Sequence, residues 1–400
     1  MRRLPPLIAL LAALATAPVA GADPLSLEEA FALAERGSPE LAAERLQVPV
    51  ASAGIGVARQ RPNPELAFEE DKETPRDALS LTVPLELGGK RGRRIDVAEA
   101  AVATSEAALA RAAILIRIKV RRAFFAVVAA ERAADDAADL AKLAERSRDA
   151  VSERFNSGDA PKLEVLQAQM AAAQSANEAD AARARAASQR AELNVLLGRE
   201  PSAETTVTGD LGTGVVPDLV TASAAAASNG DLKVLELRLG EQDRRVSLAR
   251  AQRWPDFGIM GAVTHRDPEF DWGWRAGVSL TLPLFHNHGA EVKLEEAALS
   301  QLTAEREARS AQVRSQVASA WTLATARGKQ YARYRDEILP TARDVEAMAE
   351  DSYRSGQTGL LELIQSITAV RDARARAIEA GLAYQDALAD LEDAMGAPIP

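Results

Sequence analysis

The stretch that decides the fold spans residues 79–94 and reads LSLTVPLELGGKRGRR. Its first half alternates Leu and Val with small or polar residues, and this period of two is typical of a β-strand with two different faces. The alternation stops at Gly88 and Gly89, and the sequence then runs to Phe155 with a helical period and no proline. The stretch therefore predicts a strand that leads into a helix, which at about 1.5 Å per residue can reach about 100 Å.

The same passage occurs twice in the chain. Three pairs of landmarks recur in the same order: TVPL (82–85) with TLPL (281–284), FNSG (155–158) with YRSG (353–356), and LEVLQ (163–167) with LELIQ (361–365). Chance or a general helical bias explains one such match but hardly all of them. The chain is therefore predicted to be an internal duplication of one unit.

Each copy is predicted to contain the same succession of elements. Two short helices come first, and the pattern Ser26-x-x-Glu29 caps the first of them, with a counterpart that starts near Thr221. A β-hairpin and a long helical hairpin follow. We place the strands at about 64–71, 77–86, 256–265 and 273–284, and the long helices at about 89–155, 161–197, 288–354 and 360–395. The copies then occupy residues 23–200 and 218–400, with a linker at 201–217.

The N-terminus has the features of a secretory signal peptide, residues 1–22. Arg2 and Arg3 form a positive start, residues 4–14 are largely apolar, and Ala20-Gly21-Ala22 matches a small-residue cleavage site. The alternative is an amphipathic first helix, which the early prolines suit poorly. No later run of 18 uninterrupted apolar residues occurs, so we expect no transmembrane helix after this segment.

Composition and motifs argue against several classes of protein. A net charge of −10 disfavours a nucleic-acid partner, which requires a basic face. The absence of cysteine rules out disulfides, thiolate metal sites and a lipid anchor on cysteine. Gly54-Ile55-Gly56 lacks the third glycine of a dinucleotide motif, and Gly88-Gly89-Lys90-Arg91 lacks the hydroxyl residue of a P-loop. We therefore predict no enzyme activity and no cofactor.

The predicted hairpins suit a membrane better than a soluble sheet. The strands are apolar on one face, a long helical segment separates the two hairpins, and no other strands are available to pair with them. Four strands cannot close a barrel, and an open sheet edge cannot lie in lipid. Copies of the chain must then combine, and a dimer of eight strands or a trimer of twelve both satisfy this argument. In the helices, the spacing of Leu163, Leu166 and Met170 predicts a coiled-coil seam.

Two groups of residues are candidates for the membrane interface. Trp272 and Trp274 lie near a strand end, where aromatic side chains meet the interfacial region. A basic cluster follows the first hairpin and is positioned to meet phospholipid headgroups of the inner leaflet. A solvated helix start explains the cluster equally well. The cluster consists of Lys90, Arg91, Arg93 and Arg94.

These features resemble the TolC-type outer-membrane efflux proteins. The resemblance is carried by the duplicated layout, by the pattern that runs from Tyr353 and Gly356 to Glu362 and Gln365, and by VPLELGGKR at 83–91. This last motif is most similar to the heavy-metal, CzcC-type (cobalt–zinc–cadmium) branch. The resemblance implies a mixed α/β membrane protein: a homotrimer with a twelve-stranded transmembrane β-barrel, four strands per chain, that continues into a twelve-helix periplasmic α-barrel of coiled-coil helices. It also implies docking to a periplasmic adaptor and an inner-membrane RND-type pump.

The resemblance also assigns residues to the periplasmic tip of the helices. Glu362 and Gln365 fall where acidic residues ring the pore of the family, although only Glu362 is acidic here. The turns at Ser157-Gly158 and Ser355-Gly356 fall where the adaptor docks. The first-copy equivalents of the gate residues, Glu164 and Gln167, are implied to lie on the outer helix pair. A solvated helix residue is the alternative for Glu362, and a positive φ alone accounts for the glycines.

A metal site at His286 and His288 is only weakly indicated. Alternation on an extended segment points both rings the same way, but a zinc site requires three or four ligands. The remaining histidine, His265, lies a strand away. These two residues are therefore weak candidates, and no confident metal site is predicted.

The function predicted from the sequence is an outer-membrane channel of a tripartite, RND-type efflux system with a large periplasmic part. It would export small solutes, divalent heavy-metal cations above all, from the periplasm of a Gram-negative bacterium. A general multidrug or type I secretion duct of the same fold is one alternative. A periplasmic coiled-coil adaptor or structural protein is the alternative from another class.

Overall fold

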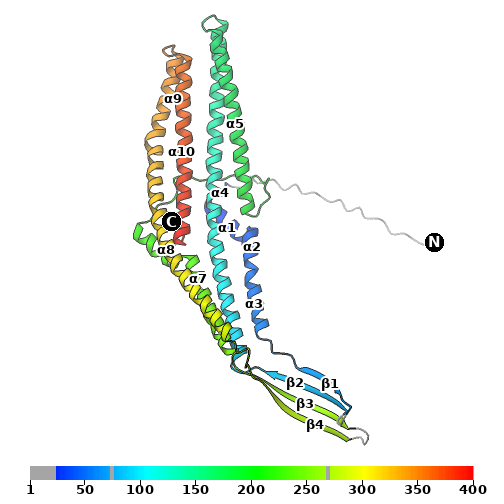
Figure 1. Ribbon diagram of the computed structural model, residues 1–400. Helices are drawn as coiled ribbons and strands as arrows, with labels where there is room; N and C mark the ends of the chain where they lie inside the picture. The colour runs from blue at the N-terminus through cyan, green and yellow to red at the C-terminus, as the bar shows by residue number, and fades with distance from the viewer. Residues whose placement is uncertain (1–23, 73–75, 267–270, 400) are drawn as a thin grey trace, which may run out of the picture.

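The structure is a computed structural model that describes residues 24–72, 76–266 and 271–399. The predicted signal peptide lies outside the described residues. The molecule is long and thin, with a β-sheet at one end and the reversals of two helical hairpins at the other (Figure 1). Within the described ranges, no helix has both the length and the apolar character that crossing a bilayer requires.

The two β-hairpins form one antiparallel sheet in the order β1-β2-β3-β4. The strands are β1 (Glu65–Glu70), β2 (Asp77–Leu85), β3 (Asp256–Arg266) and β4 (Asp271–Thr281). The middle pair joins the two copies, with Leu85 opposite Phe257. Four strands per chain are thus confirmed, but β4 ends before the predicted residue 284. The reason is that its partner β3 begins only at Asp256, directly after Pro255, so residues 282–284 have no backbone opposite them.

The two faces of the sheet differ sharply. Cross-strand neighbours on one face are apolar: Leu66 with Leu81, Phe68 with Leu79, Val83 with Ile259, Phe257 with Leu280, Ile259 with Val278 and Val263 with Trp274. Many of these side chains are exposed, and Trp274 reaches 81%. The other face carries mostly small or polar residues, among them Ser80, Thr82 and Ser279. Nothing in the described part of the chain covers the apolar face.

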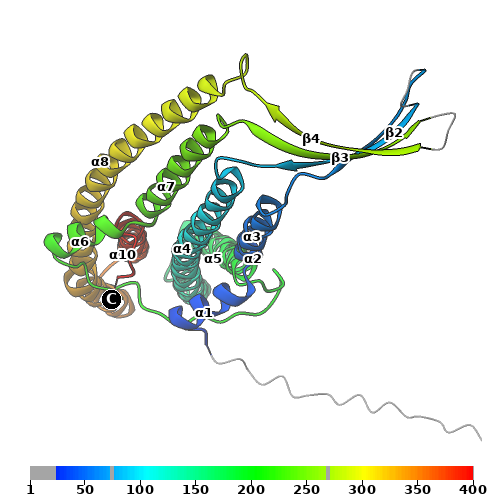
Figure 2. The same cartoon turned by 90° about the horizontal axis from the view of Figure 1, so that it is seen from below.

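The helices nearest the sheet form a curved row. Figure 2 shows α3 (Gln47–Ala58), α4 (Lys90–Asn156), α7 (Gly230–Ala251) and α8 (Gly289–Arg333) side by side. The shorter helices α1 (Leu27–Gly37), α2 (Pro39–Arg45) and α6 (Leu219–Ala225) flank this row. The predicted capping box of Ser26 and Glu29 is present in α1. Its counterpart α6, expected to start near Thr221, begins two residues earlier at Leu219 and is capped by Asp218. The helices of one chain therefore form an open, curved layer rather than a closed bundle.

Two helical hairpins extend the row away from the sheet: α4 with α5 (Lys162–Leu196), and α9 (Leu339–Arg354) with α10 (Leu360–Met395). The predicted helix at 288–354 is interrupted by a π-helical turn, Tyr334–Ile338. Pro340 accounts for this turn, because proline has no N–H to donate to the carbonyl four residues earlier. The chain thus remains helical past Pro340 by widening locally.

The coiled-coil seam predicted for α5 is not the surface that packs within the chain. Leu163, Leu166 and Met170 are exposed by 52–67%. The buried stripe consists of Val165, Ala168, Ala172, Ala179, Ala182 and Ala186. It keeps the spacing of three and four, but small side chains allow α5 to approach α4 closely, whereas leucine in the seam would hold the two helices apart.

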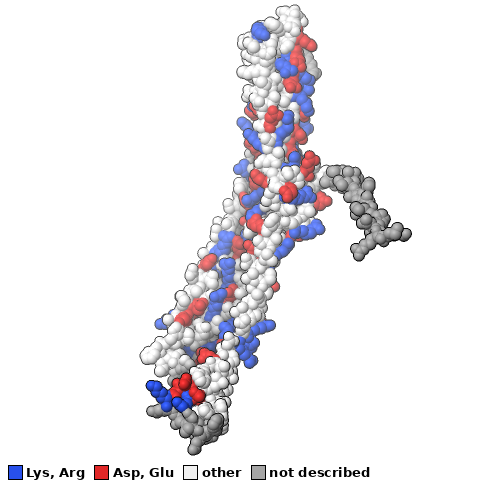
Figure 3. All heavy atoms as spheres, turned by 90° about the vertical axis from the view of Figure 1, so that its right-hand side faces the viewer, with Lys and Arg blue, Asp and Glu red and all other residues white. Residues whose placement is uncertain are grey.

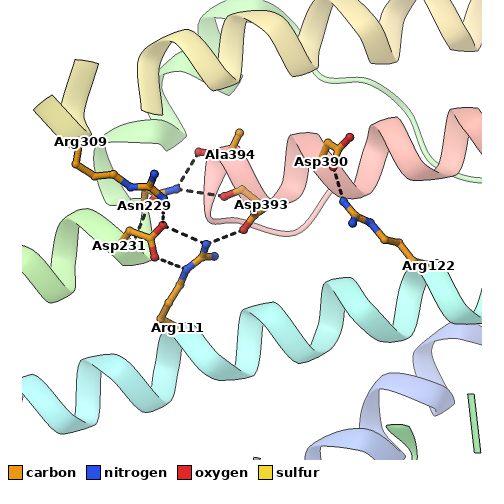
Figure 4. Close-up of polar contacts among 8 residues, drawn as sticks. All are labelled: Arg111, Arg122, Asn229, Asp231, Arg309, Asp390, Asp393 and Ala394. Atoms are coloured by element: carbon orange, nitrogen blue, oxygen red, sulfur yellow. Dashed lines mark hydrogen bonds and ion pairs between the residues drawn. The ribbon is translucent and has the colours of Figure 1, made fainter. Parts of the chain in front are cut away.

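A partly buried polar network ties the two copies together (Figure 4). Arg111 of α4 donates from Nε to Oδ1 of Asp231 in α7 at 2.6 Å, and from Nη2 to Oδ1 of Asp393 in α10 at 2.7 Å. Arg309 of α8 also binds Asp231. Burial alone would raise the pKa of Asp231, but the bonds from Arg111 and Arg309 hold this pKa below its usual range. The network fixes four helices at the level where the copies meet.

Candidate functional site

The helical hairpins reverse at two turns of the same construction. The α4–α5 turn contains Ser157 and Gly158, and the α9–α10 turn contains Ser355 and Gly356. Both glycines have a positive φ, 87° for Gly158 and 72° for Gly356. This left-handed conformation ends the helix and lets the chain reverse direction. Each serine hydroxyl donates to a carbonyl four residues earlier in its own helix. All four residues are exposed, so both turns can meet another molecule.

Glu362 and Gln365 lie one turn apart on α10, close to its start at the tip. Both are exposed, whereas Leu363 between them is only 3% exposed and packs with Val151 and Val165 of the other hairpin. The carboxylate of Glu362 therefore points away from the contact between the hairpins. A carboxylate free to face solvent near a pore axis attracts cations. Glu164, its first-copy equivalent, is half-buried instead.

A contact between α4 and α9 joins the two hairpins near their tips. The Nη1 atom of Arg154 donates to the hydroxyl of Tyr353 at 3.4 Å, and its guanidinium lies 5.9 Å from the centre of the tyrosine ring. Tyr353 is the first residue of the motif that leads to Gly356. This contact is exposed and long, so it can be broken at little cost.

The predicted basic cluster lies at the start of α4, where all four of its members bond within the chain. Lys90 is buried and its Nζ lies 2.6 Å from Oδ1 of Asp256 at the start of β3. Arg94 binds Glu86, and this bond raises the pKa of Arg94. Arg91 donates from Nε to the carbonyl of Arg59 at 2.8 Å, and Arg93 pairs with Asp96. The cluster thus fastens the strand end to the helix start, and its contact with lipid headgroups remains a prediction.

Trp272 and Trp274 lie at the end of the sheet that is remote from the helices. Both are on the apolar face of β4, and they stand opposite His265 and Val263 of β3. The rings of Trp272 and His265 are 5.1 Å apart. Exposed tryptophans at one end of an apolar sheet are typical of the membrane interface. This position of Trp272 and Trp274 stays a prediction.

The weak metal candidates His286 and His288 are brought together with a third residue. Glu291, in the first turn of α8, lies beside both imidazoles, and one donor atom from each residue falls within 4.8 Å of the others. Glu291 was not predicted as a ligand, because it lies in the helix that follows the extended segment of the two histidines. The signal was present in the spacing His286-x-His288-x-x-Glu291 across the start of a helix.

On the face drawn in Figure 3, both signs of charge occur along the helices. Figure 3 shows acidic and basic side chains interspersed along the helical part of the face it draws. Neither sign gathers there into one large field. On this face, the surface is therefore that of an ordinary mixed-charge helical wall.

The sequence model of the family described as outer membrane efflux protein matches this chain twice, over residues 31–199 and 221–397. The chain belongs to this family. The two matches follow the two copies of the hairpin unit. Membership places this efflux protein in the outer membrane, and it confirms the resemblance stated from the sequence.

Two relatives of the efflux protein come from Cupriavidus metallidurans. The cobalt-zinc-cadmium resistance protein CzcC is 27% identical over 383 residues, which cover 92% of this chain and 90% of the relative. The nickel and cobalt resistance protein CnrC is 31% identical over 292 residues, which cover 70% of this chain and 68% of the relative. The similarity to the heavy-metal branch is thus confirmed.

Solved channels share the fold. The CusC channel aligns with a TM-score of 0.76 at 16% identity, over 93% of this chain and 92% of that chain. The CmeC outer membrane channel of Campylobacter jejuni aligns with a TM-score of 0.78 at 15% identity, over 92% of this chain and 85% of that chain. The efflux protein therefore has the TolC-like fold of a sheet segment continued by long helices.

Proposed function

We propose that this efflux protein is the outer-membrane duct of a tripartite, RND-type efflux system and carries out no chemical reaction. The observation that carries the proposal is a sheet with two unpaired edges and an exposed apolar face, continued by helices that end in exposed turns. A duct needs these features, because its sheet must close with other copies, face lipid outside and open into the periplasm. A soluble coiled-coil adaptor would need no such sheet.

Three copies are the expected assembly. The free edges of β1 and β4 would pair between neighbours and give twelve strands, and the helical rows would close into one tube. The exposed leucines of α5, Leu163 and Leu166, lie near the tip and would be covered by a neighbouring chain or by the periplasmic adaptor. The turns at Ser157-Gly158 and Ser355-Gly356 are the proposed docking positions for that adaptor.

Divalent heavy-metal cations are the proposed substrate. The support is that the relatives CzcC and CnrC are named for resistance to cobalt, zinc, cadmium and nickel. Bacteria that lack this protein are expected to lose growth in these metals while keeping their tolerance of detergents and dyes. The opposite pattern would identify a general multidrug duct of the same fold.

Transport through the duct is passive, and the inner-membrane pump supplies the energy. Three Glu362 carboxylates, one from each chain, would ring the periplasmic opening and favour cations over anions. The contact of Arg154 with Tyr353 would hold neighbouring hairpins together until the adaptor separates them.

Single-channel conductance of the purified protein in planar bilayers tests both the duct and the ring. The wild-type protein is expected to show a small cation-selective conductance. Glu362→Gln removes the charge at constant shape, so its selectivity is expected to fall toward that of bulk solution. Arg154→Ala loosens the tip and is expected to raise the conductance.

Glu164→Gln is the matched control, since Glu164 holds the equivalent position in the first copy. It is expected to leave selectivity unchanged. Equal selectivity in wild type and Glu362→Gln would show that Glu362 does not set the selectivity of the pore, although the protein would still be a duct. If the wild-type protein and Arg154→Ala are both trimeric but neither of them conducts ions, the proposal that this protein is a duct is wrong.

A further inference from the structure

Three potential metal ligands converge where β4 gives way to α8. The Nε2 atom of His286 lies 2.7 Å from Oε1 of Glu291, and Nδ1 of His288 lies 3.9 Å from the same oxygen. The imidazole rings are 4.4 Å apart, centre to centre. Ligands of a tetrahedral zinc ion, each bonded at about 2.0–2.1 Å, stand about 3.3 Å from one another. The three donor atoms are therefore grouped as an ion would require, after small rotations of exposed side chains.

The backbone at His288 is an unusual place for histidine. His288 is the N-cap residue of α8 and has a φ of 54°, and no other non-glycine residue in the described part of the chain has a positive φ. The first copy uses glycine at the same point, because Gly89 is the N-cap residue of α4 with a φ of 72°. A left-handed conformation disfavours a residue with a Cβ. Histidine here is thus not explained by the needs of the turn.

The comparison of the two copies extends to all three ligands. Residues 281–284 match 82–85, and at the same offset His286, His288 and Glu291 fall on Leu87, Gly89 and Gly92. The first copy builds the same strand-to-helix junction without any of the ligands. The duplicated fold therefore does not require them, and their convergence in the second copy needs another reason.

We propose that His286, His288 and Glu291 form a binding site for a divalent cation of the Zn²⁺ or Co²⁺ type. Two imidazoles with one carboxylate suit these borderline metals, whereas Ca²⁺ and Mg²⁺ prefer oxygen ligands alone. Three protein ligands leave a further position to water or to another molecule. The ion would join the extended segment before α8 to the first turn of that helix.

The electrostatics of the junction make the carboxylate essential. The N-terminus of a helix carries partial positive charge, which opposes a cation. Glu291 supplies the opposite charge in that first turn, beside both imidazoles. The same contacts also permit a simpler reading, in which His286 only pairs with Glu291. Metal binding separates the two readings.

Equilibrium metal binding to the purified, full-length protein tests the site. The protein carries no polyhistidine tag, is stripped with EDTA, and is titrated with Co²⁺ while visible absorption is followed; Zn²⁺ then competes. One Co²⁺ per chain with the strong absorption of a four-coordinate site is expected. This test needs neither conductance nor export, so it stands apart from the proposed function.

His286→Leu and His288→Gly place the first-copy residues at these positions and are expected to weaken binding by at least about tenfold. His288→Gly also removes the unfavourable φ, so this variant is expected to fold as wild type does and its loss of binding reports on the missing imidazole. His265→Gln, which alters the remaining histidine, is the matched control and is expected to bind as wild type does. The proposal is overturned if wild type shows no saturable binding, or if His288→Gly binds as tightly as wild type.

Discussion

At the scale of single residues, His288 is the clearest departure from what the fold alone prefers. A left-handed backbone costs a residue with a Cβ about 1–2 kcal/mol, and glycine escapes this cost. Glycine in turn loses about 0.4–1 kcal/mol through the greater freedom of the unfolded chain. The difference favours glycine at this position, as the first copy has at Gly89.

We therefore expect His288→Gly to raise the free energy of unfolding by up to about 1.5 kcal/mol in the presence of EDTA. The temperature at which the detergent-solubilised protein loses its folded form on heating measures this change. Asn287→Gly should lower stability, because the Oδ1 atom of Asn287 accepts a hydrogen bond from the amide of Gly289. If His288→Gly is instead less stable than wild type, the side-chain contacts of His288 stabilise the protein by more than its positive φ destabilises it.

At the scale of elements, the last helix of each copy ends on a glycine packed against another backbone. Gly198 follows α5 with a φ of 71°, and a Cβ there would lie 2.0 Å from the carbonyl oxygen of Gly37 at the end of α1. Gly396 follows α10 with a φ of 68°, and its Cβ would lie 2.8 Å from Cα of Asn229. These contacts hold the end of α1 against the end of α5, and the start of α7 against the end of α10.

Gly198→Ala is expected to destabilise the protein by about 2–4 kcal/mol, since it combines an unfavourable φ with a clash against backbone that cannot move aside. Gly89→Ala is the control for φ alone, because a Cβ at Gly89 meets nothing within 4 Å. It should cost only about 1–2 kcal/mol. Denaturant unfolding followed by helical circular dichroism measures both, and equal costs would show that the contact with Gly37 is unimportant.

A buried ion pair between α4 and α10 offers a second test at this scale. Arg121 lies 3.1 Å from Glu392, and the side chains are 4% and 2% exposed. Burial lowers the pKa of Arg121, although Glu392 opposes this shift. Arg121→Ala should cost about 3–5 kcal/mol, because it leaves the Glu392 carboxylate buried with no opposite charge beside it, only the amide of Ile399. Replacing both residues, Arg121→Met with Glu392→Leu, should restore most of that loss; additive losses would contradict the coupling.

At the scale of the whole molecule, the decisive feature is an incomplete wall. The sheet has open edges at β1 and β4, its apolar face is exposed, and the helices lie in a curved row. Open edges and bare apolar surface are costly in an isolated chain, so the chain is one part of a larger closed structure. Lipid is the proposed neighbour of the apolar face.

Substitution by arginine on each face of β4 tests which face of the sheet contacts lipid and which faces the lumen of the proposed barrel. Val278→Arg would put a charge on the proposed lipid face and should cost about 2–4 kcal/mol, which lowers the amount of folded protein in the outer membrane. Ser279→Arg lies on the other face, where Arg275 already stands, and should be tolerated. Fractionation and heat-modifiable mobility report both variants. Equal tolerance would mean that lipid does not contact this face.

Much of the architecture was predictable because it depends on local patterns. The alternation in residues 79–85 defined a strand, the long proline-free run after Gly89 defined a helix, and the recurrence of both implied the duplication. The strand and helix positions agree with the structure to within a few residues. The π-helical turn before Pro340 was missed, since a helix can either end at a proline or widen before it, and packing decides which.

The sequence by itself determined the elements, their order and the family, because periodicity and motifs are written in consecutive residues. Only the tertiary structure decided which residues share a surface. In α5 the buried stripe consists mainly of alanines and does not include Leu163. Lys90 pairs with Asp256, and Arg154 contacts Tyr353. Glu291 lies beside His286 and His288. Such pairings depend on how closely two backbones approach and on how a helix starts in space, and neither distance is contained in a local pattern.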